Sequence, residues 1–203
     1  MTNFFELIKL SLYSPRSISN DLKSLKLTNY NLIEALIFVT CLSTIITFAS
    51  LYLQIWIYKD STLDIDPLFI FFSKLPVLLV VVQILGITFF SFLITIIGKF
   101  FSGNGNFFTI FRFVIWINFV LALVNILQVV LIFLSLQLSG LVGILGTFWS
   151  MWAVAALAAE AHNFKSTGIT AFVGAIVLVS VFLILVIFFQ LFGLIVFEEI
   201  IDV

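Results

Sequence analysis

Long runs of apolar residues without a single charged side chain dominate this chain. Four such runs occupy residues 35–58, 75–98, 113–159 and 166–197. A helix that crosses the roughly 30 Å hydrocarbon layer of a bilayer needs about 20 predominantly apolar residues. The first, second and fourth runs each reach this length, so the pattern predicts membrane-spanning helices.

The third run is too long for one span, because 47 residues of helix would extend about 70 Å at about 1.5 Å per residue. It must therefore fold back on itself. The polar, Gly-containing sequence Gln137-Leu138-Ser139-Gly140 lies near its middle and is the predicted corner. The chain is thus expected to be all-α, a polytopic integral membrane protein with five transmembrane helices. The spans are predicted at about residues 32–58, 76–98, 109–137, 140–161 and 169–196.

Three regions follow from this division of the chain. Residues 1–30 are expected to form an amphipathic cytoplasmic segment, and residues 31–197 the transmembrane domain. Residues 198–203 form a short acidic tail. No secretory signal is expected, because the first apolar run exceeds the roughly 7–15 residues of a signal h-region.

Composition supports the membrane assignment and removes several other classes. Of 203 residues, 63% are hydrophobic and 9% are charged, with a mean hydropathy of +1.32, whereas a soluble domain carries roughly 25% charged residues. Nine basic residues against ten acidic ones leave no surplus of positive charge for nucleic acid. The single cysteine, Cys41, excludes an internal disulfide framework and a cysteine-based metal cluster.

The basic residues are distributed unevenly between the two ends of the predicted spans. Seven lie on the side that holds the amino-terminal segment: Lys9, Arg16, Lys23, Lys26, Lys99, Arg112 and Lys165. Two lie on the other side, Lys59 and Lys74, together with the acidic residues of the tail. Because positive residues accumulate in cytoplasmic loops, we expect the amino terminus in the cytoplasm and the carboxyl terminus outside.

The amino-terminal segment shows helical spacing of apolar residues. The apolar positions are Phe4, Phe5, Ile8 and Leu12, then Ile18, Leu22 and Leu25, with Ser14-Pro15 between them. This pattern predicts one or two short amphipathic helices. The apolar stripe either lies on the cytoplasmic leaflet or packs against the ends of the spans.

Polar residues at membrane depth are concentrated on the predicted third span. Asn118, Asn125 and Gln128 share one face of that helix, and unsatisfied amides should not face lipid. One interpretation is a polar seam that lines a substrate path. We favour structural hydrogen bonds between helices, worth about 0.6 kcal/mol each.

Charged residues near the span ends form a second candidate group. Glu34, Arg112, Glu160 and His162 are all expected at the cytoplasmic boundary. An ion pair of Arg112 with Glu34 or with Glu160 is feasible. A structural role is favoured over ligand binding or proton handling, since Asn31-x-x-Glu34 has capping-box spacing. The small residues of the predicted fourth span should let its neighbours approach closely and place it centrally in the bundle.

No residues for catalysis, cofactor binding or metal binding are predicted. One His with one Glu is a poor metal-binding set, and no nucleophile–base pair can be assembled. Gly103-Asn104-Gly105 lacks the other residues of a phosphate-binding loop and is expected to form a turn.

Several short sequences together resemble a bacterial member of the Yip family, whose eukaryotic members are Ypt/Rab-interacting proteins of the secretory pathway. These are Tyr13-Ser14-Pro15-Arg16, Ser102-Gly103-Asn104-Gly105-Asn106-Phe107, Trp116 and Ala159-Glu160-Ala161-His162-Asn163-Phe164-Lys165-Ser166. The resemblance implies a five-helix membrane domain with a cytoplasmic amino terminus. It transfers no catalytic residues. Because only about 30 residues precede the first predicted span, we expect little of the amino-terminal region with which the eukaryotic members engage small GTPases.

The leading hypothesis is a non-enzymatic protein of the bacterial inner membrane that organises the membrane or scaffolds partner proteins. Its expected partners are the lipid bilayer and either other proteins or further copies of itself, and no cofactor is expected. The alternative is a small-molecule or ion transporter or channel that acts as an oligomer. An oligomer would be needed because five spans do not divide into equal inverted halves. In that case Asn118, Asn125 and Gln128 would line the route, and the boundary cluster of Glu34, Arg112, Glu160 and His162 would form a cytoplasmic gate.

Overall fold

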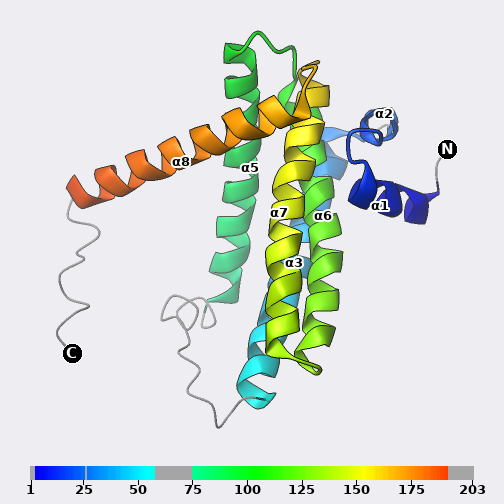
Figure 1. The fold of residues 1–203 in the computed structure, drawn as a ribbon, viewed down its shortest axis with the longest axis vertical. Coiled ribbons are helices and arrows are strands. Elements are labelled where there is room, and N and C mark those ends of the chain that lie inside the picture. Colours follow the sequence, from blue (N-terminus) through cyan, green and yellow to red (C-terminus); the bar gives the residue numbers. More distant parts are fainter. Residues whose placement is uncertain (1–2, 26, 58–74, 192–203) are drawn as a thin grey trace.

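A computed structural model describes residues 3–25, 27–57 and 75–191, and every regular element in these ranges is an α-helix. Two short helices precede five long ones (Figure 1). The helices are α1 (Phe4–Tyr13), α2 (Ser19–Ser24), α3 (Asn29–Ile57), α5 (Pro76–Phe100), α6 (Phe107–Ile132), α7 (Leu136–Ala161) and α8 (Thr167–Leu191). The predicted all-α class is confirmed for the described residues.

Helices α3, α5, α6 and α7 form the bundle, and each is long and apolar enough to cross a membrane. Helix α6 contacts all three of the others and is therefore the central helix. The sequence had predicted this central position for the small-residue span that corresponds to α7. One side of α6 packs on α3 through Phe111 and Ile115. Another side packs on α7 through Phe113 and Ile117. Large branched and aromatic side chains of α6 thus pack against buried residues of α7 that are mostly small, among them Ala153 and Ala159.

The predicted fold-back in the longest apolar run is present, but its corner lies earlier than expected. Helix α6 ends at Ile132 and α7 begins at Leu136. Ser135 is the N-cap of α7, and its hydroxyl accepts from the Leu138 backbone N–H. A serine in this position satisfies one of the free N–H groups of a helix start. The predicted corner at residues 137–140 therefore lies inside the first turns of α7.

The start of α3 also differs from the prediction. The helix begins at Asn29, and the Thr28 hydroxyl accepts from the Asn31 backbone N–H while Asn31 Oδ1 accepts from the Thr28 N–H. The reciprocal cap is therefore formed three residues earlier than the predicted Asn31–Glu34 box.

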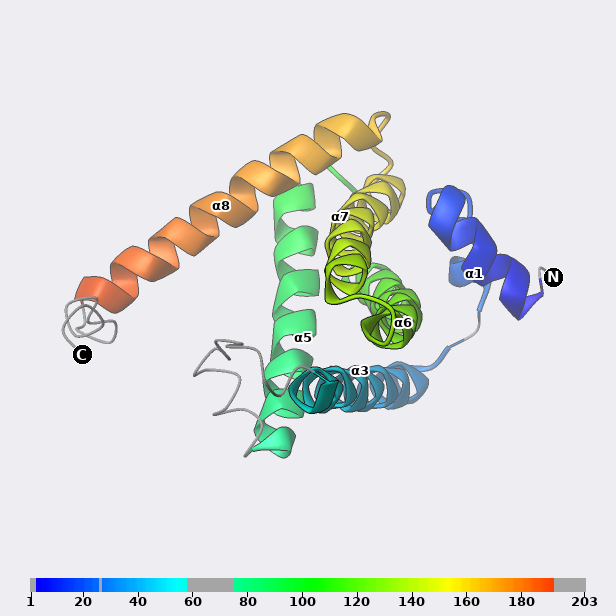
Figure 2. The ribbon, with the colours of Figure 1, turned by 60° about the horizontal axis from the view of Figure 1, so that its bottom comes forward.

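Helix α8 is directed away from the bundle axis, as two views show (Figure 1 and Figure 2). It covers most of the predicted fifth span, and residues 192–196 of that span lie outside the described residues. Its stretch Thr167–Val177 is apolar. Four of the predicted spans are confirmed as apolar helices of sufficient length, and the fifth stays a prediction. The acidic tail at 198–203 and the connection at 59–74 also lie outside the described residues.

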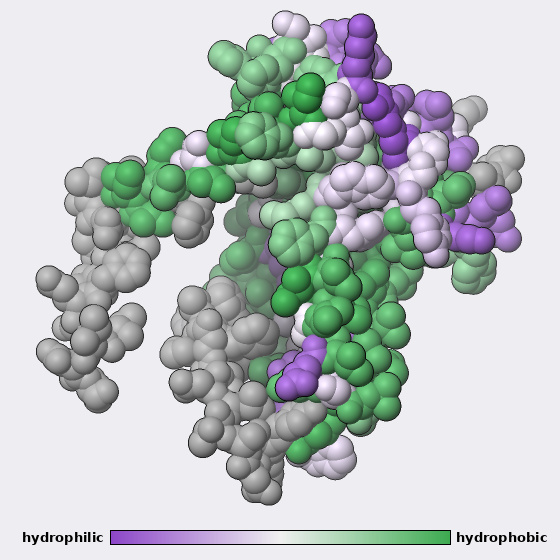
Figure 3. Space-filling view, viewed as in Figure 1, coloured by the Kyte–Doolittle hydropathy of each residue, from purple (hydrophilic) through white to green (hydrophobic). Residues whose placement is uncertain are grey.

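Three segments gather at one end of the bundle: α1–α2, the loop between α5 and α6, and the turn between α7 and α8 (Figure 1). This is the grouping that the alternation of basic residues predicted. Hydrophilic residues concentrate at this end, whereas the remaining visible surface of the bundle is mainly hydrophobic (Figure 3). Such a surface is suited to contact with lipid tails.

Candidate functional site at one end of the bundle

The two amino-terminal helices pack against the end of the bundle. Leu7, Ile18 and Leu22 are buried in one cluster with residues of α6 and α7. Of the two interpretations of the apolar stripe, packing against the spans is therefore observed. The stripe on α1 is not the predicted one, because Leu7 and Ser11 are buried while Phe5 is 77% exposed. The helix thus packs with one face and presents a second, aromatic face outward.

Hydrogen bonds from two tryptophans hold α1 in place. Trp116 Nε1 on α6 donates to the Ser11 hydroxyl at 2.9 Å, and Trp149 Nε1 on α7 donates to the Leu12 carbonyl at 3.1 Å. A tryptophan N–H at a partly buried site needs such an acceptor. These two bonds attach α1 to both α6 and α7.

Arginines connect the amino-terminal unit, defined here as α1, α2 and residues 14–18 between them, to the spans. Arg112 on α6 donates to the Leu22 carbonyl at 2.9 Å and to the Lys23 carbonyl at 3.2 Å. Arg16 Nε donates to Glu160 Oε2 at 2.9 Å, with the two side chains 38% and 27% exposed. Arg16 also donates to the Phe164 carbonyl at 2.8 Å. Each arginine therefore joins two segments that are far apart in the sequence.

The two ion pairs that the sequence made feasible for Arg112 do not form. Glu160 is the partner of Arg16, and Glu34 lies exposed on α3, where no ion pair is found for it among the described residues. Arg16 was missed as a site residue. The signal that could have found it is its place directly after Ser14-Pro15, in one of the short sequences on which the family resemblance rests.

The ends of α5 and α7 are built in the same way where they meet. Ser102 and Asn163 both have left-handed backbone, with φ of 62° and 58°. The Gly103 N–H bonds to the Gly98 carbonyl at 2.8 Å, and the Phe164 N–H bonds to the Ala159 carbonyl at 2.7 Å. These are the longer bonds of two Schellman motifs, which end helices and fix the direction of the following residue.

His162, the residue that ends α7, fills the space between these two helix ends. Its side chain is 3% exposed and stacks on Phe164, with ring centroids 5.4 Å apart. A Cβ atom added at Gly98, Gly103 or Gly105 would lie less than 3.0 Å from the imidazole ring. Three glycines therefore make room for one histidine, and no larger residue fits at these positions without a shift.

The hydrogen bonds of His162 fix its neutral form. Nδ1 accepts from the Gly105 backbone N–H at 3.0 Å, so a neutral ring carries its proton on Nε2. Nε2 is buried and has no hydrogen-bond partner in the described part of the chain. Burial lowers the pKa of His162 below its ordinary value of 6.5; backbone groups of Ile94 and Gly103 oppose this shift, and the charge of Lys99 adds to it. The ring is thus held as an uncharged spacer between helix ends.

The stability of the protein is expected to fall as the pH drops below about 6.5. The unfolded chain takes up a proton near the ordinary pKa of 6.5, whereas the folded chain takes it up only at lower pH. Acidification therefore favours unfolding in this window. A series of thermal melts between pH 7.5 and pH 5 measures the effect, and His162 is the only histidine of the chain.

The matched variant is His162→Asn, whose Oδ1 can still accept from the Gly105 N–H but does not titrate. Its melting temperature should change less over the same pH range. An equal slope in both proteins would assign the pH dependence to other groups.

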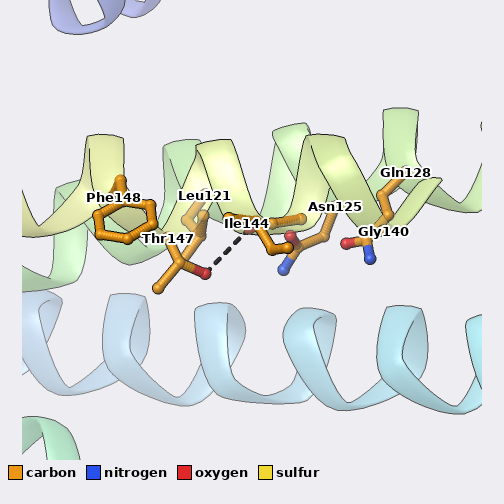
Figure 4. A pocket seen from close by; sticks show the side chains of 8 residues that line it. Leu121, Asn125, Gln128, Gly140, Ile144, Thr147 and Phe148 are labelled. Atoms are coloured by element: carbon orange, nitrogen blue, oxygen red, sulfur yellow. Dashed lines mark hydrogen bonds between the residues drawn. The ribbon is translucent and has the colours of Figure 1, made fainter. Parts of the chain in front are cut away.

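The three amides of α6 line two adjoining cavities. Asn118 borders a large cavity next to α5, α7 and α8 and donates to the Val114 carbonyl of its own helix. Asn125 and Gln128 border a second cavity of about 580 Å³, beside Gly140 and Thr147 of α7 (Figure 4). Leu121 and Phe148 line both cavities.

Gln128 also lies against Ser139 and Gly143 of α7. Its carbonyl accepts from the Ser139 hydroxyl at 3.0 Å, and a Cβ at Gly143 would lie 2.7 Å from Gln128 Nε2. The hydrogen bond from Ser139 uses the backbone of Gln128 and not its amide side chain. The site role of Asn118, Asn125 and Gln128 stays a prediction.

Comparison with known proteins gives one match. A family model described as the Yip1 domain matches residues 9–189. A search of curated proteins and a search of solved structures each return no match. The matched range includes Arg16, the glycine-rich loop after α5 and the end of α7, and thus nearly all of the site described above.

Proposed function

This chain belongs to the Yip1 domain family, and on that premise we propose that it is a non-enzymatic membrane protein that organises the surrounding bilayer and its protein neighbours. We place it in a bacterial inner membrane, with the amino-terminal unit on the cytoplasmic side and the carboxyl terminus outside. The membrane-embedded helices make the lipid bilayer its first partner. Other proteins or further copies of the chain are the second.

One observation carries this proposal: the amino-terminal unit is docked firmly and still presents an apolar surface. Leu7, Ile18 and Leu22 are buried against α6 and α7. On the same unit Phe5 is 77% exposed and Tyr13 is 76% exposed. Aromatic side chains of this kind favour the boundary between lipid tails and headgroups. A rigid unit at one end of the bundle can therefore act on one leaflet or on a neighbouring protein.

Removing the exposed aromatic residues of α1 is expected to disturb how the protein distributes in the membrane. In the double variant Phe5→Ser with Tyr13→Ser, the buried contacts of the unit remain. Energy transfer between donor- and acceptor-labelled protein in phospholipid vesicles should fall by about half or more if this surface mediates association. Electron cryomicroscopy of the same vesicles reports any change in their shape.

The matched control removes exposed apolar residues from a span at the same end of the bundle. Tyr30 and Ile33 on α3 are 70% and 53% exposed, and Tyr30→Ser with Ile33→Ser should leave energy transfer and vesicle shape unchanged. If the α1 variant behaves like this control, the proposal for α1 is wrong.

A second candidate function, transport by an oligomer, is favoured by the cavity beside Asn125 and Gln128. The cavity combines two amides with Thr147 between spans that lie in lipid. Solute flux into vesicles tests it. Flux that is abolished by Asn125→Leu with Gln128→Leu would favour transport over organisation, and absence of flux from the unmodified protein would exclude this candidate for the solutes used.

A further inference from the structure

We propose that the large cavity between α5, α6, α7 and α8 binds one acyl chain of an anionic phospholipid from the surrounding leaflet. The cavity has a volume of about 970 Å³. Its walls are mainly apolar and come from four helices, among them Phe90 of α5, Met151 of α7 and Val173 of α8. This inference goes beyond the organising role above and uses none of the exposed aromatic residues of α1.

The depth of the cavity matches one leaflet of a bilayer. Along α5 its wall extends from Gly98, next to the end of the helix, to Gly86, which is about 18 Å at about 1.5 Å per residue. Along α7 it extends from Ala158 to Phe148, or about 15 Å. Half of a hydrocarbon layer of roughly 30 Å is about 15 Å. A chain that enters from the headgroup region at this end would therefore reach the middle of the bilayer.

Most polar side chains that line the cavity already make hydrogen bonds; the buried exception in the described part of the chain is His162, whose Nε2 lies at the end near the mouth. Asn118, Ser150 and Thr170 line the cavity, and each donates to a carbonyl of its own helix or of the residue just before it. A side chain that already makes its hydrogen bond adds little binding free energy for a polar ligand. The occupant of the interior should thus be apolar, and the spans already lie in the apolar solvent that supplies it.

The mouth of the cavity is positively charged. Lys165 and Ser166 line it at the end where the amino-terminal unit lies. Lys165 is exposed and has no carboxylate partner in the described part of the chain, since Glu160 pairs with Arg16. Arg16 is already engaged here, because its guanidinium donates to the carbonyls of Phe164 and Lys165 at 2.8 and 3.2 Å. It is therefore not a second free cation at the mouth. A lysine fixed at headgroup depth attracts a phosphate.

Lipid retention by the purified, delipidated full-length protein tests the proposal. Native mass spectrometry should show one phosphatidylglycerol molecule retained per chain, about tenfold more strongly than phosphatidylcholine. Gly86→Leu and Gly174→Leu fill the cavity from opposite walls, and a Cβ at either position meets no atom within 4 Å. Each variant should fold and lose about tenfold or more of the retained lipid.

Gly140→Leu is the matched control. A Cβ at Gly140 also meets no atom within 4 Å, but this glycine borders the smaller cavity, nearer the first turns of α7. Retention of lipid should be unchanged. Equal retention by all three glycine variants would show ordinary lipid on the outer surface and would overturn the proposal.

The charge at the mouth is tested separately. Lys165→Gln should remove the preference for phosphatidylglycerol and leave retention of phosphatidylcholine unchanged, whereas Lys9→Gln, at an exposed lysine of α1, should change neither. An unchanged preference in Lys165→Gln would overturn the assignment of the headgroup. A dimer that dissociates in Gly174→Leu would show that a second copy of the chain fills the cavity, and would also overturn the proposal.

Discussion

Replacing Gly98 with alanine is expected to lower the free energy of unfolding by about 3 kcal/mol, the upper part of the usual range for an overpacked core. The added Cβ would overlap the His162 ring. The ring cannot move aside, because the backbone of Gly103 and Gly105 in the following loop also packs against it, with no room for a Cβ at either position. In detergent, the melting temperature of the purified protein should fall by roughly 6–12 °C for a chain of this size.

Two controls separate this overlap from a general effect of substituting glycine in a helix. Gly86 lies on the same helix, and a Cβ there meets no atom within 4 Å. Gly86→Ala should therefore be neutral or slightly stabilising. In a His162→Ala background the ring is absent, so the further change Gly98→Ala should cost little. Additive losses in the double variant would mean that Gly98 and His162 do not interact.

Truncating Leu22 to alanine is expected to release the amino-terminal unit from the bundle. Leu22 is 0% exposed and belongs to the cluster formed with α6 and α7. Removing a buried leucine side chain costs about 2–5 kcal/mol. Because α1 and α2 pack mainly on α6 and α7 at one end of the bundle, the loss should appear as local opening. Hydrogen exchange of peptides from residues 4–24 should accelerate at least roughly 30-fold.

Phe5→Ala provides the comparison, because Phe5 is 77% exposed and exposed substitutions usually change stability by less than about 0.5 kcal/mol. Exchange in residues 4–24 should then remain close to that of the unmodified protein. Rapid exchange in both variants, or in neither, would contradict the assignment of Leu22 as the anchor of the unit.

The spans could be predicted from the sequence because each needs only an uninterrupted apolar run. The fold-back between α6 and α7 followed from the length of one run. The predicted corner was placed too late in the chain, because Gln137 and Gly140 are the more polar residues of this stretch. The observed turn ends earlier, where Ser135 caps the start of α7. Local hydrogen bonding therefore decided a boundary that hydropathy alone did not locate.

The contacts at the end of the bundle could be predicted only in part. His162, Arg112 and Glu160 were expected at this boundary, but their partners come from residues far away in the chain. Arg16 bonds to Glu160 across 144 positions, and hydropathy gives no signal for such a pair. The space around His162 requires Gly98 from one helix and Gly105 from a loop, which only the folded arrangement brings together.

The bond between Arg16 and Glu160 also has a consequence for how the protein is made. At a synthesis rate of about 5–20 residues per second, Glu160 leaves the ribosome roughly 7–30 s after Arg16. Throughout that interval Leu22 and Ile18 have no α7 to cover them. A nascent chain must therefore shelter this early segment, in the lipid surface or on an insertion factor, until its late partner arrives.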